Sequence, residues 1–325
     1  MRKIKSVLIV RLGKLGDMMA ASFVIKKIRQ SYPHLKIGLL TLPRSRELFK
    51  YNKDIDELFV WHPLTLPFLF LKQRLKKWDL LIDLSDDASR RSILALKLIN
   101  PKYSIAFDNE RSRKNFEMTI RTFSKDKSHV IKRLSVMLRV FGIQAKEKEL
   151  KPVVYTDKKV ISKLTRAFKQ NQIFLISVNI SAGHISRYWA VEKWIKLIRE
   201  LLKLSKKIRI LILSSPKDMQ TRKYIINEIN DKRAVEFKDN DLHYFLSAIA
   251  VSDLLISPDT SAIHAACAFG TPVIGLYPEP YWNFVSFKPV GVKNLVIRSK
   301  QNGINSISFR EAKTKIIKFI HKLIY

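Results

Sequence analysis

The stretch KSVLIVRLGKLGDMMAASFVIKKIRQSYP, residues Lys5–Pro33, decides the fold class. It opens with the apolar run Ser6–Val10, turns at Gly13 and Gly16, and continues from Asp17 as a helical segment. A buried strand, a glycine turn and a helix in this order are typical of the start of a βαβ unit. In open α/β sheets the loop after the first strand lies in the functional crevice, so this turn is the first candidate site.

The same alternation of short β-branched runs and helical segments continues along the chain, which predicts parallel sheets covered by helices on both faces. A single core stops growing near roughly 250 to 300 residues, so a chain of 325 residues favours two Rossmann-like domains. The predicted strands are Ser6–Val10, Ile37–Leu42, Glu57–Trp61, Leu80–Leu84 and Tyr103–Phe107, followed by Phe174–Asn179, Arg209–Ser214, Ala234–Phe237, Leu254–Ser257, Val273–Tyr277 and Leu295–Ile297.

The boundary between the domains is predicted near Lys146–Tyr155. A helix over Ser128–Phe141 ends at Gly142, and a charged stretch then leads to Pro152. We therefore divide the chain into residues 1–150 and 151–325.

The last helix is predicted to begin at Ser308. Glu311 stands three residues later, which is the spacing of a capping box, and Ala312, Ile316, Ile320 and Leu323 share one face.

The chain is strongly basic, with 61 Lys and Arg against 28 Asp and Glu and a formal charge of +33. Such an excess favours an anionic partner: nucleic acid, an anionic membrane face or a phosphorylated small molecule. Cys267 is the single cysteine, so no intrachain disulfide can form, which fits a reducing compartment. The longest largely apolar stretch, Pro63–Leu71, is too short to span a bilayer, so we expect a cytoplasmic protein.

A second polar turn lies in SDLLISPDTSAIHAACAFGTPVIGLYPEP, residues Ser252–Pro280. A strand ends, Asp259 and Thr260 open a helix, and His264 follows one turn later. The first amides of this helix, from Thr260, Ser261 and Ala262, would be free donors for a diphosphate. The alternatives stay open at this point: Asp17 and Asp259 as helix caps, and His264 as a buried structural histidine.

The chain resembles glycosyltransferase family 9, the ADP-heptose:lipopolysaccharide heptosyltransferase-like enzymes of the GT-B fold, over nearly its whole length. The segments that carry the resemblance are VLIVRLGKLGDMMAASFVIKKIRQSYP, DLLIDLSDDASRRS, SHVIKRLSVMLRVFGI, SRYWAVEKWIKLI and SPDTSAIHAACAFGTPVIGLY. The resemblance implies two Rossmann-like parallel-sheet domains that face each other across a cleft. We expect the acceptor to bind the first domain, the nucleotide sugar to bind the second, and the final helix, residues 308–325, to pack back toward the first.

The resemblance also implies roles for single residues. Asp17 would be the general base of an inverting transfer, with Gly13 and Gly16 on the acceptor side, and Arg187 of SRYW would clamp the departing diphosphate. The implied donor-binding residues are Ala182, Gly183, Asp218, Asp259, Thr260, Ser261 and His264. The implied co-substrate is a nucleotide sugar, with ADP-heptose favoured, and the implied acceptor is a lipopolysaccharide-core or similar anionic glycolipid.

Three positions depart from the family pattern. Ser261 replaces the usual glycine after Asp-Thr, Ala190 replaces a proline after Trp189, and YPEPYWNF replaces Gly-Pro-Thr-Asp-Pro. These departures concern the donor sugar rather than the transfer chemistry.

No catalytic metal is predicted. Asp54-Ile-Asp56 and Asp239-Asn-Asp241 have DxD spacing, but the first runs into a strand and the second precedes a helix as a cap. The sequence shows no His/Cys cluster with ligand spacing.

The segment LPFLFLKQRLKKW, residues Leu66–Trp78, joins an apolar run to basic residues and is a candidate for contact with an anionic membrane, or else a core-facing helix with a solvated basic edge. We expect a peripheral protein on the inner face of the cytoplasmic membrane. The alternatives are another GT-B enzyme, such as a nucleotide-sugar epimerase, and a basic nucleic-acid-binding protein; no nucleic-acid motif supports the second. The membrane-facing candidates are Lys72, Arg74, Lys76 and Lys77, and the basic acceptor-side candidates are Arg90, Arg91, Arg111, Arg113 and Lys114.

Overall fold

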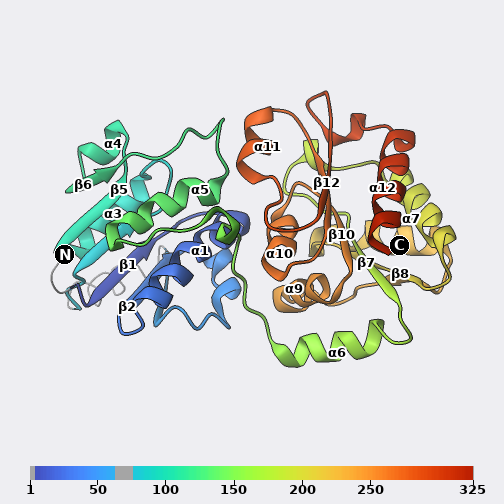
Figure 1. Cartoon of the computed structure of the whole chain (residues 1–325), viewed down its shortest axis with the longest axis horizontal. Helices are drawn as coiled ribbons and strands as arrows, with labels where there is room; N and C mark the ends of the chain where they lie inside the picture. The colour runs from blue at the N-terminus through green and yellow to red at the C-terminus, as the bar shows by residue number, and fades with distance from the viewer. Residues whose placement is uncertain (1–3, 63–75, 325) are drawn as a thin grey trace. The chain divides into compact units, whose positions relative to one another are not determined.

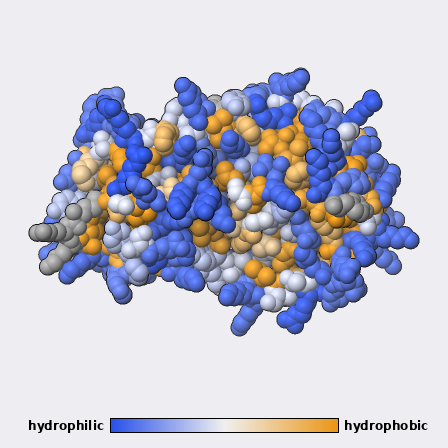
Figure 2. Space-filling model, in the orientation of Figure 1, coloured by the Kyte–Doolittle hydropathy of each residue, from blue (hydrophilic) through white to orange (hydrophobic). Residues whose placement is uncertain are grey.

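The computed structural model describes residues 4–62 and 76–324 (Figure 1 and Figure 2). The chain divides into two compact units, Met1–Tyr155 and Thr156–Tyr325. Lys72, Arg74 and the apolar part of the predicted membrane segment lie outside the described residues.

The first unit is built on a six-stranded parallel sheet of order β3-β2-β1-β4-β5-β6. In β1 at the centre, Ile9 lies between Leu39 and Ile82. The strand order reverses between β1 and β4, so the loops after these two strands form the switch point where α/β proteins bind ligands. The strands are β1 (Ser6–Val10), β2 (Lys36–Thr41), β3 (Glu57–Val60), β4 (Leu80–Asp83), β5 (Tyr103–Phe107) and β6 (Met118–Ile120).

The second unit repeats this arrangement, with the order β12-β11-β10-β7-β8-β9 and parallel pairing throughout. Its switch point lies between β7 and β10, where Leu255 pairs with Ser177. The strands are β7 (Phe174–Asn179), β8 (Ile208–Leu213), β9 (Ala234–Glu236), β10 (Leu254–Pro258), β11 (Val273–Tyr277) and β12 (Asn294–Arg298).

Helices connect the strands in both units (Figure 1). The first unit contains α1 (Leu15–Ser31), α3 (Arg90–Ile99), α4 (Glu110–Arg113) and α5 (Val130–Ser135). The second contains α6 (Lys158–Phe168), α7 (Val191–Leu204), α8 (Met219–Ile229), α9 (Leu242–Val251), α10 (Ser261–Phe269), α11 (Tyr281–Phe287) and α12 (Phe309–Ile324).

The predicted fold class, two α/β units with parallel sheets, is confirmed, and two local predictions need correction. Strand β6 was not predicted, because three residues at a sheet edge, none of them buried, leave no apolar run to detect. The helix predicted over Ser128–Phe141 is α5 followed by a 3₁₀ segment, Val136–Phe141. It ends as predicted at Gly142, whose φ of 69° favours glycine.

The final helix begins as the capping pattern predicts, since Ser308 Oγ accepts a hydrogen bond from the Glu311 amide at 3.1 Å. Its predicted direction is wrong. Ala312, Ile316 and Ile320 lie in the core of the second unit, and α12 packs on α7 and β12. The apolar face of the helix is therefore used within its own unit.

Candidate functional site

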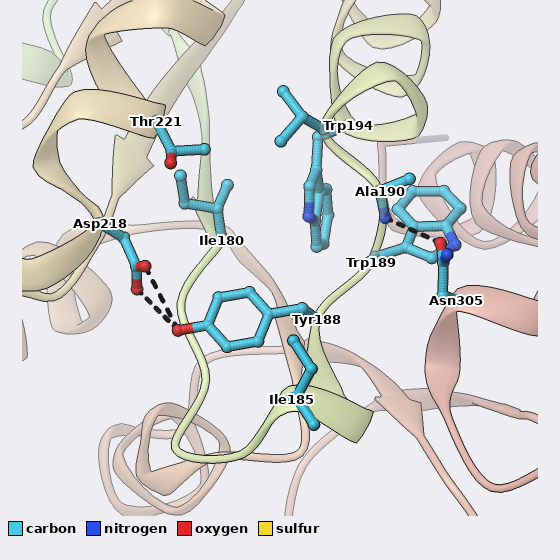
Figure 3. Close-up of a pocket in the computed structure, with 10 residues that line it drawn as sticks. Ile180, Ile185, Tyr188, Trp189, Ala190, Trp194, Asp218, Thr221 and Asn305 are labelled. Atoms are coloured by element: carbon cyan, nitrogen blue, oxygen red, sulfur yellow. Dashed lines mark hydrogen bonds between the residues drawn. The ribbon is translucent and has the colours of Figure 1, made fainter.

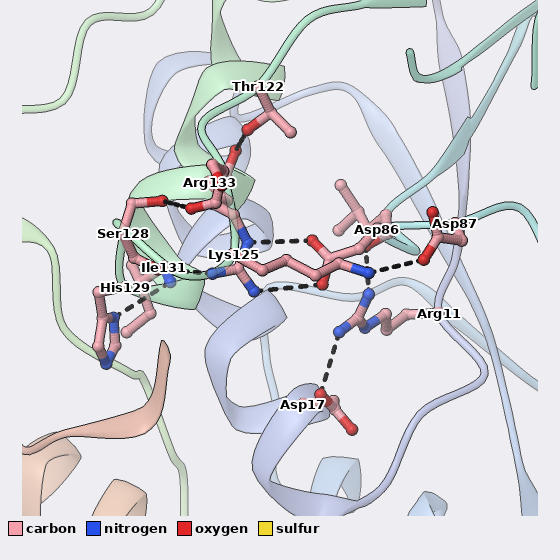
Figure 4. Close-up of polar contacts among 12 residues, drawn as sticks. Arg11, Asp17, Asp86, Asp87, Thr122, Lys125, Ser128, His129, Ile131 and Arg133 are labelled. Carbon is pink, nitrogen blue, oxygen red and sulfur yellow. Dashed lines mark hydrogen bonds and ion pairs between the residues drawn. The ribbon is translucent and has the colours of Figure 1, made fainter. Parts of the chain in front are cut away.

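Asp17 lies in the first turn of α1, directly after the glycine turn (Figure 4). Its Oδ2 accepts a hydrogen bond from the Lys14 amide at 3.1 Å, and its Oδ1 accepts one from Arg11 Nη2 at 3.2 Å. Asp17 therefore does cap the start of α1, as the structural alternative predicts. The side chain nevertheless stays 27% exposed, so the carboxylate is also open to a substrate.

Arg11 is a site residue that sequence reasoning missed. It is buried, its Nη1 donates to the carbonyl of Leu84, and its Nη2 holds Asp17 (Figure 4). Leu84 directly follows β4, so the guanidinium joins the two loops of the switch point. A signal was present in hindsight, because a charged residue at the end of a buried strand needs a partner.

Asp83, the last residue of β4, is completely buried beside this arginine. Its Oδ1 accepts a hydrogen bond from the Ser85 amide at 2.9 Å, whereas its Oδ2 has no partner among the described residues. Burial raises the pKa of the Asp83 carboxyl, and Ser92, Ser85 and Arg11 oppose this rise. The switch point of the first unit thus holds two aspartates in contrasting environments.

The loop after β4 is tied down by two further ion pairs (Figure 4). The buried Arg133 donates to Asp86 at 3.3 and 3.2 Å, and Lys125 donates to Asp87 at 2.6 Å. These contacts explain why two segments of the resemblance, residues 79–92 and 128–143, belong together.

Gly13 leaves room for Asp17. A Cβ atom at residue 13 would lie 2.7 Å from Asp17 Cβ, which is closer than real side chains approach. We expect Gly13→Ala to displace Asp17, to lower the free energy of unfolding by about 1–3 kcal/mol and to lower activity. Urea denaturation measures the first effect, with Gly183→Ala as the control because a Cβ there meets nothing within 4 Å. Equal stability of the two variants would contradict this role of Gly13.

The predicted acceptor-side cations differ in their surroundings. Arg111 donates to the Ala88 carbonyl at 3.1 Å, and Arg111 and Lys114 line a polar cavity of about 610 Å³. Arg90 and Arg91 stand exposed in the first turn of α3. The cavity is lined by Asp87, Ala88, Asn109, Glu110, Arg111, Lys114 and Asn115.

Arg113 is engaged elsewhere. It donates to Asp108 at 2.7 and 3.0 Å, and this contact is the main cause that lowers the pKa of Asp108 to about 2. Lys114 also pairs with Glu110 at 2.6 Å on the exposed surface. Lys76 pairs with Glu57, and Lys77 is exposed.

In the second unit, Asp259 lies at the switch point, directly after β10. Only 4% of the residue is exposed, yet it has two partners. Asn283 donates to its Oδ2 at 2.6 Å, and Arg187 Nε lies 3.5 Å from the same oxygen. Arg187 Nη1 also donates to the Asp259 main-chain carbonyl at 3.0 Å. Burial raises the pKa of Asp259, whereas Arg187 and Asn283 oppose the rise.

The start of α10 lies beside this carboxylate. Thr260 is the N-cap and accepts a hydrogen bond from the Ala262 amide at 3.3 Å. The Asn179 side-chain amide donates to Ser257 Oγ at 3.0 Å and to Thr260 Oγ1 at 3.3 Å, which fixes the ends of β7 and β10 to each other. Ser261, the first helical residue, is half-buried.

His264 is buried one turn into α10, and its ring lies edge-on to Phe287 at 5.9 Å. This contact packs the imidazole against the end of α11, as the alternative of a buried structural histidine predicts.

The loop after β7 contains Ala182, which is buried, and Gly183, which is exposed. Asp218 accepts a hydrogen bond from Tyr188 Oη at 3.0 Å (Figure 3) and one from Ser215 Oγ at 2.9 Å. Tyr188 also donates to the Ala182 carbonyl at 2.9 Å. Asp218 and Tyr188 line a cavity of about 390 Å³, together with Ile180, Ile185, Trp189, Ala190, Val191, Trp194, Thr221 and Asn305.

Asn283 is the second residue that sequence reasoning missed, although it lies within the divergent YPEPYWNF segment. We expect Asn283→Ala to leave Asp259 without its closest donor and to lower kcat/KM for the donor about tenfold, which is the cost of one buried hydrogen bond to a charged group. Steady-state kinetics at varied donor concentration measures this. Asn294→Ala is the matched control, because Asn294 is exposed and donates only locally, to Val292. An Asn283→Ala variant with the kinetics of the control would rule out this role.

Within residues 4–62 and 76–324, no group of three His, Cys, Asp or Glu side chains is placed to hold a metal ion. Asp241 of the second DxD triplet caps α9, as predicted, by accepting hydrogen bonds from the His243 and Tyr244 amides. The described helices also include none that is long and apolar enough to cross a bilayer.

Comparisons with known proteins place this geometry in a family. The model of glycosyltransferase family 9 (heptosyltransferase) matches residues 69–315. The lipopolysaccharide core heptosyltransferase OpsX of Haemophilus influenzae is 25% identical over 289 residues, which cover 84% of this chain and 79% of the relative.

Solved structures share the fold at lower identity. A glycosyltransferase family 9 protein from Veillonella parvula has a TM-score of 0.81 at 17% identity, covering 98% of this chain and 97% of its own. The E. coli ADP-heptose lipopolysaccharide heptosyltransferase II has a TM-score of 0.78 at 16% identity, covering 98% and 99%. The chain therefore belongs to glycosyltransferase family 9 and is a heptosyltransferase-like glycosyltransferase of the GT-B fold.

Proposed function

We propose that this enzyme transfers a heptose, with inversion, from ADP-heptose to a lipopolysaccharide-core or similar envelope glycolipid. The observation that carries the proposal is the cluster of Asp259, Arg187 and Asn283 at the start of α10. A sugar diphosphate needs a carboxylate for its hydroxyls and donors for its phosphates, and this cluster offers both.

The donor is bound by the second unit in this proposal. Asp259 contacts sugar hydroxyls, while the planar guanidinium of Arg187 and the amides of Thr260 and Ser261 meet the diphosphate. Ala182 and Gly183 let the loop after β7 approach the phosphates. His264 packs on Phe287 and so helps to hold the start of α10 in place. Asp218 holds Tyr188 in place, and its remaining acceptor sites are assigned to the ribose hydroxyls.

Asp17 is the general base in this proposal. The acceptor hydroxyl oxygen attacks the anomeric carbon, its proton passes to the Asp17 carboxylate, and the bond to the diphosphate breaks with its electron pair on the phosphate oxygen. One displacement inverts the anomeric configuration. Arg11 acts as a positioning residue, because it holds Oδ1 of Asp17 and leaves the carboxylate with a fixed orientation.

The acceptor is anionic in this proposal. Arg111 and Lys114 line the polar cavity beside the loop after β4, and Arg90 and Arg91 stand exposed at the adjoining helix start. The net charge of +33 favours the same class of acceptor and a position on the cytoplasmic face of the inner membrane. The diphosphate charge is met by Arg187 and helix amides, so no metal is needed.

The test is an assay of nucleoside-diphosphate release from a panel of nucleotide sugars, in buffer with EDTA, with and without a core glycolipid. We expect release from ADP-heptose only when the acceptor is present. If only a different nucleotide sugar is used, that sugar takes the place of heptose in the proposal. A requirement for a divalent cation would reject the metal-free step. If no donor releases its nucleoside diphosphate, the proposed function is rejected.

A further inference from the structure

Helix α3 has two faces of opposite character. Ser92, Ala95, Leu96 and Ile99 are buried, and the last three belong to the core of the first unit. The opposite face is exposed and consists of Arg90, Arg91, Leu94, Lys97 and Leu98, which we call the α3 strip.

The strip is continuous along the helix. Leu94 stands three or four residues from each other member, so all of them are neighbours on one surface. Leu94 is 43% exposed and Leu98 is 37% exposed, which is high for aliphatic side chains.

The charge of the strip has one sign. Residues 88–107 contain no Asp or Glu, and Lys102 adds an exposed cation just beyond the helix. Lys102 lies over the ring of Tyr103 at 5.4 Å, and Tyr103 is itself 38% exposed. Aliphatic side chains between cations, followed by an aromatic residue, are typical of surfaces that rest in the headgroup layer of an anionic membrane.

We propose that the α3 strip docks the enzyme on an anionic membrane surface, which deepens the proposed function by assigning the surface that brings it to a lipid-borne acceptor. A bilayer offers anionic headgroups to the cations and acyl chains to the two leucines. Nucleic acid would meet the cations but offers nothing to aliphatic side chains, and a second copy of the strip would repel this one through its charge.

The position of the strip fits the acceptor side. Its Arg90 end directly follows the loop that contains Asp87 and Ala88, and both residues line the polar cavity. A glycolipid whose acyl chains lie under the strip would therefore have its anionic headgroup near Arg111 and Lys114.

Co-sedimentation of the full chain with vesicles tests this docking. The wild type should bind vesicles of equal parts phosphatidylcholine and phosphatidylglycerol, and bind pure phosphatidylcholine much more weakly. Lys97→Gln/Lys102→Gln should lower the partition coefficient roughly fivefold per lysine, because one basic residue near an anionic surface contributes about 1 kcal/mol to membrane binding. Lys318→Gln/Lys322→Gln on α12, which removes the same charge from exposed positions of the second unit, should stay close to wild type.

The leucines provide the sharper variant. Leu94→Ser/Leu98→Ser should lower vesicle binding about tenfold or more, because it removes the inserted apolar surface without touching the core. Leu94→Ile/Leu98→Ile should bind like the wild type. Unchanged binding of the serine variant would overturn the proposal, as would a wild type that ignores anionic lipid. A change confined to oligomeric state or to nucleic-acid binding would overturn it equally.

This docking and the proposed transfer can fail separately. With a water-soluble, delipidated acceptor the serine variant should turn over like the wild type, and with acceptor in vesicles it should be slower. If neither form of acceptor is used by the wild type, the proposed function fails, whereas the vesicle result still decides the role of the strip.

Discussion

Asp17→Asn is expected to lower kcat for sugar transfer about a thousandfold. General bases contribute roughly 10²–10⁴ to rate, and an amide cannot accept the proton of the attacking hydroxyl. The Asn side chain retains an oxygen for the Lys14 amide, so the start of α1 should remain folded. The measurement is acceptor-dependent nucleoside-diphosphate release by wild type and variant.

Two controls make this loss specific. Donor binding, measured by calorimetry, should be unchanged in Asp17→Asn, because the donor is assigned to the second unit. Asp56→Asn should keep full activity. Asp56 also pairs with an arginine, Arg29, but it precedes β3 and so lies at the amino-terminal ends of the parallel strands, whereas Asp17 lies at their carboxyl ends. Transfer by Asp17→Asn within a few fold of the wild type would show that another group takes the proton.

Arg187→Gln is expected to lower kcat by about 10²–10³, the usual cost of removing one donor aimed at developing charge. A neutral glutamine cannot balance the negative charge of the departing diphosphate, and it cannot form the ion pair with the Asp259 carboxylate. Arg187→Lys should recover only part of the rate, because an ammonium lacks the planar fork. Arg199→Gln on the exposed face of α7 is the matched surface control.

The pH profile should separate this effect from simple misfolding. Burial raises the pKa of Asp259 and Arg187 opposes that rise, so Arg187→Gln should raise the pKa further. Because the carboxylate form exists above its pKa, the acid limb of the kcat/KM profile should move to higher pH in the variant. An acid limb that keeps its position would contradict the coupling between Arg187 and Asp259.

Much of the fold follows from local pattern. The predicted bounds of β1, β5, β7 and β11 match the structure, because a buried parallel strand is a short, largely apolar run between turn signals. The edge strand β6 lacks such a run. The direction of α12 depends on which unit accepts its apolar face, and that information lies in α7 and β12 rather than in the helix.

Some residues of the candidate site also follow from local sequence, whereas others depend on distant partners. Asp17 and Asp259 could be placed because each directly follows a recognisable strand and turn. Arg11 and Asn283 act through partners that lie far from them in sequence or on another element: Arg11 reaches Leu84, and Asn283 on α11 reaches Asp259. The position of Asp218 after β8 suggests a ribose contact, which stays a prediction, and the structure adds that Tyr188 and Ser215 donate to its carboxylate.

The measurement that tests the central claim most directly is the NMR spectrum of the product formed by the wild-type enzyme from ADP-heptose and a core acceptor. We predict a new glycosidic linkage whose anomeric configuration is opposite to that of the donor, since one displacement assisted by Asp17 inverts the carbon. A linkage with retained configuration, or free heptose without any linkage, would contradict the account.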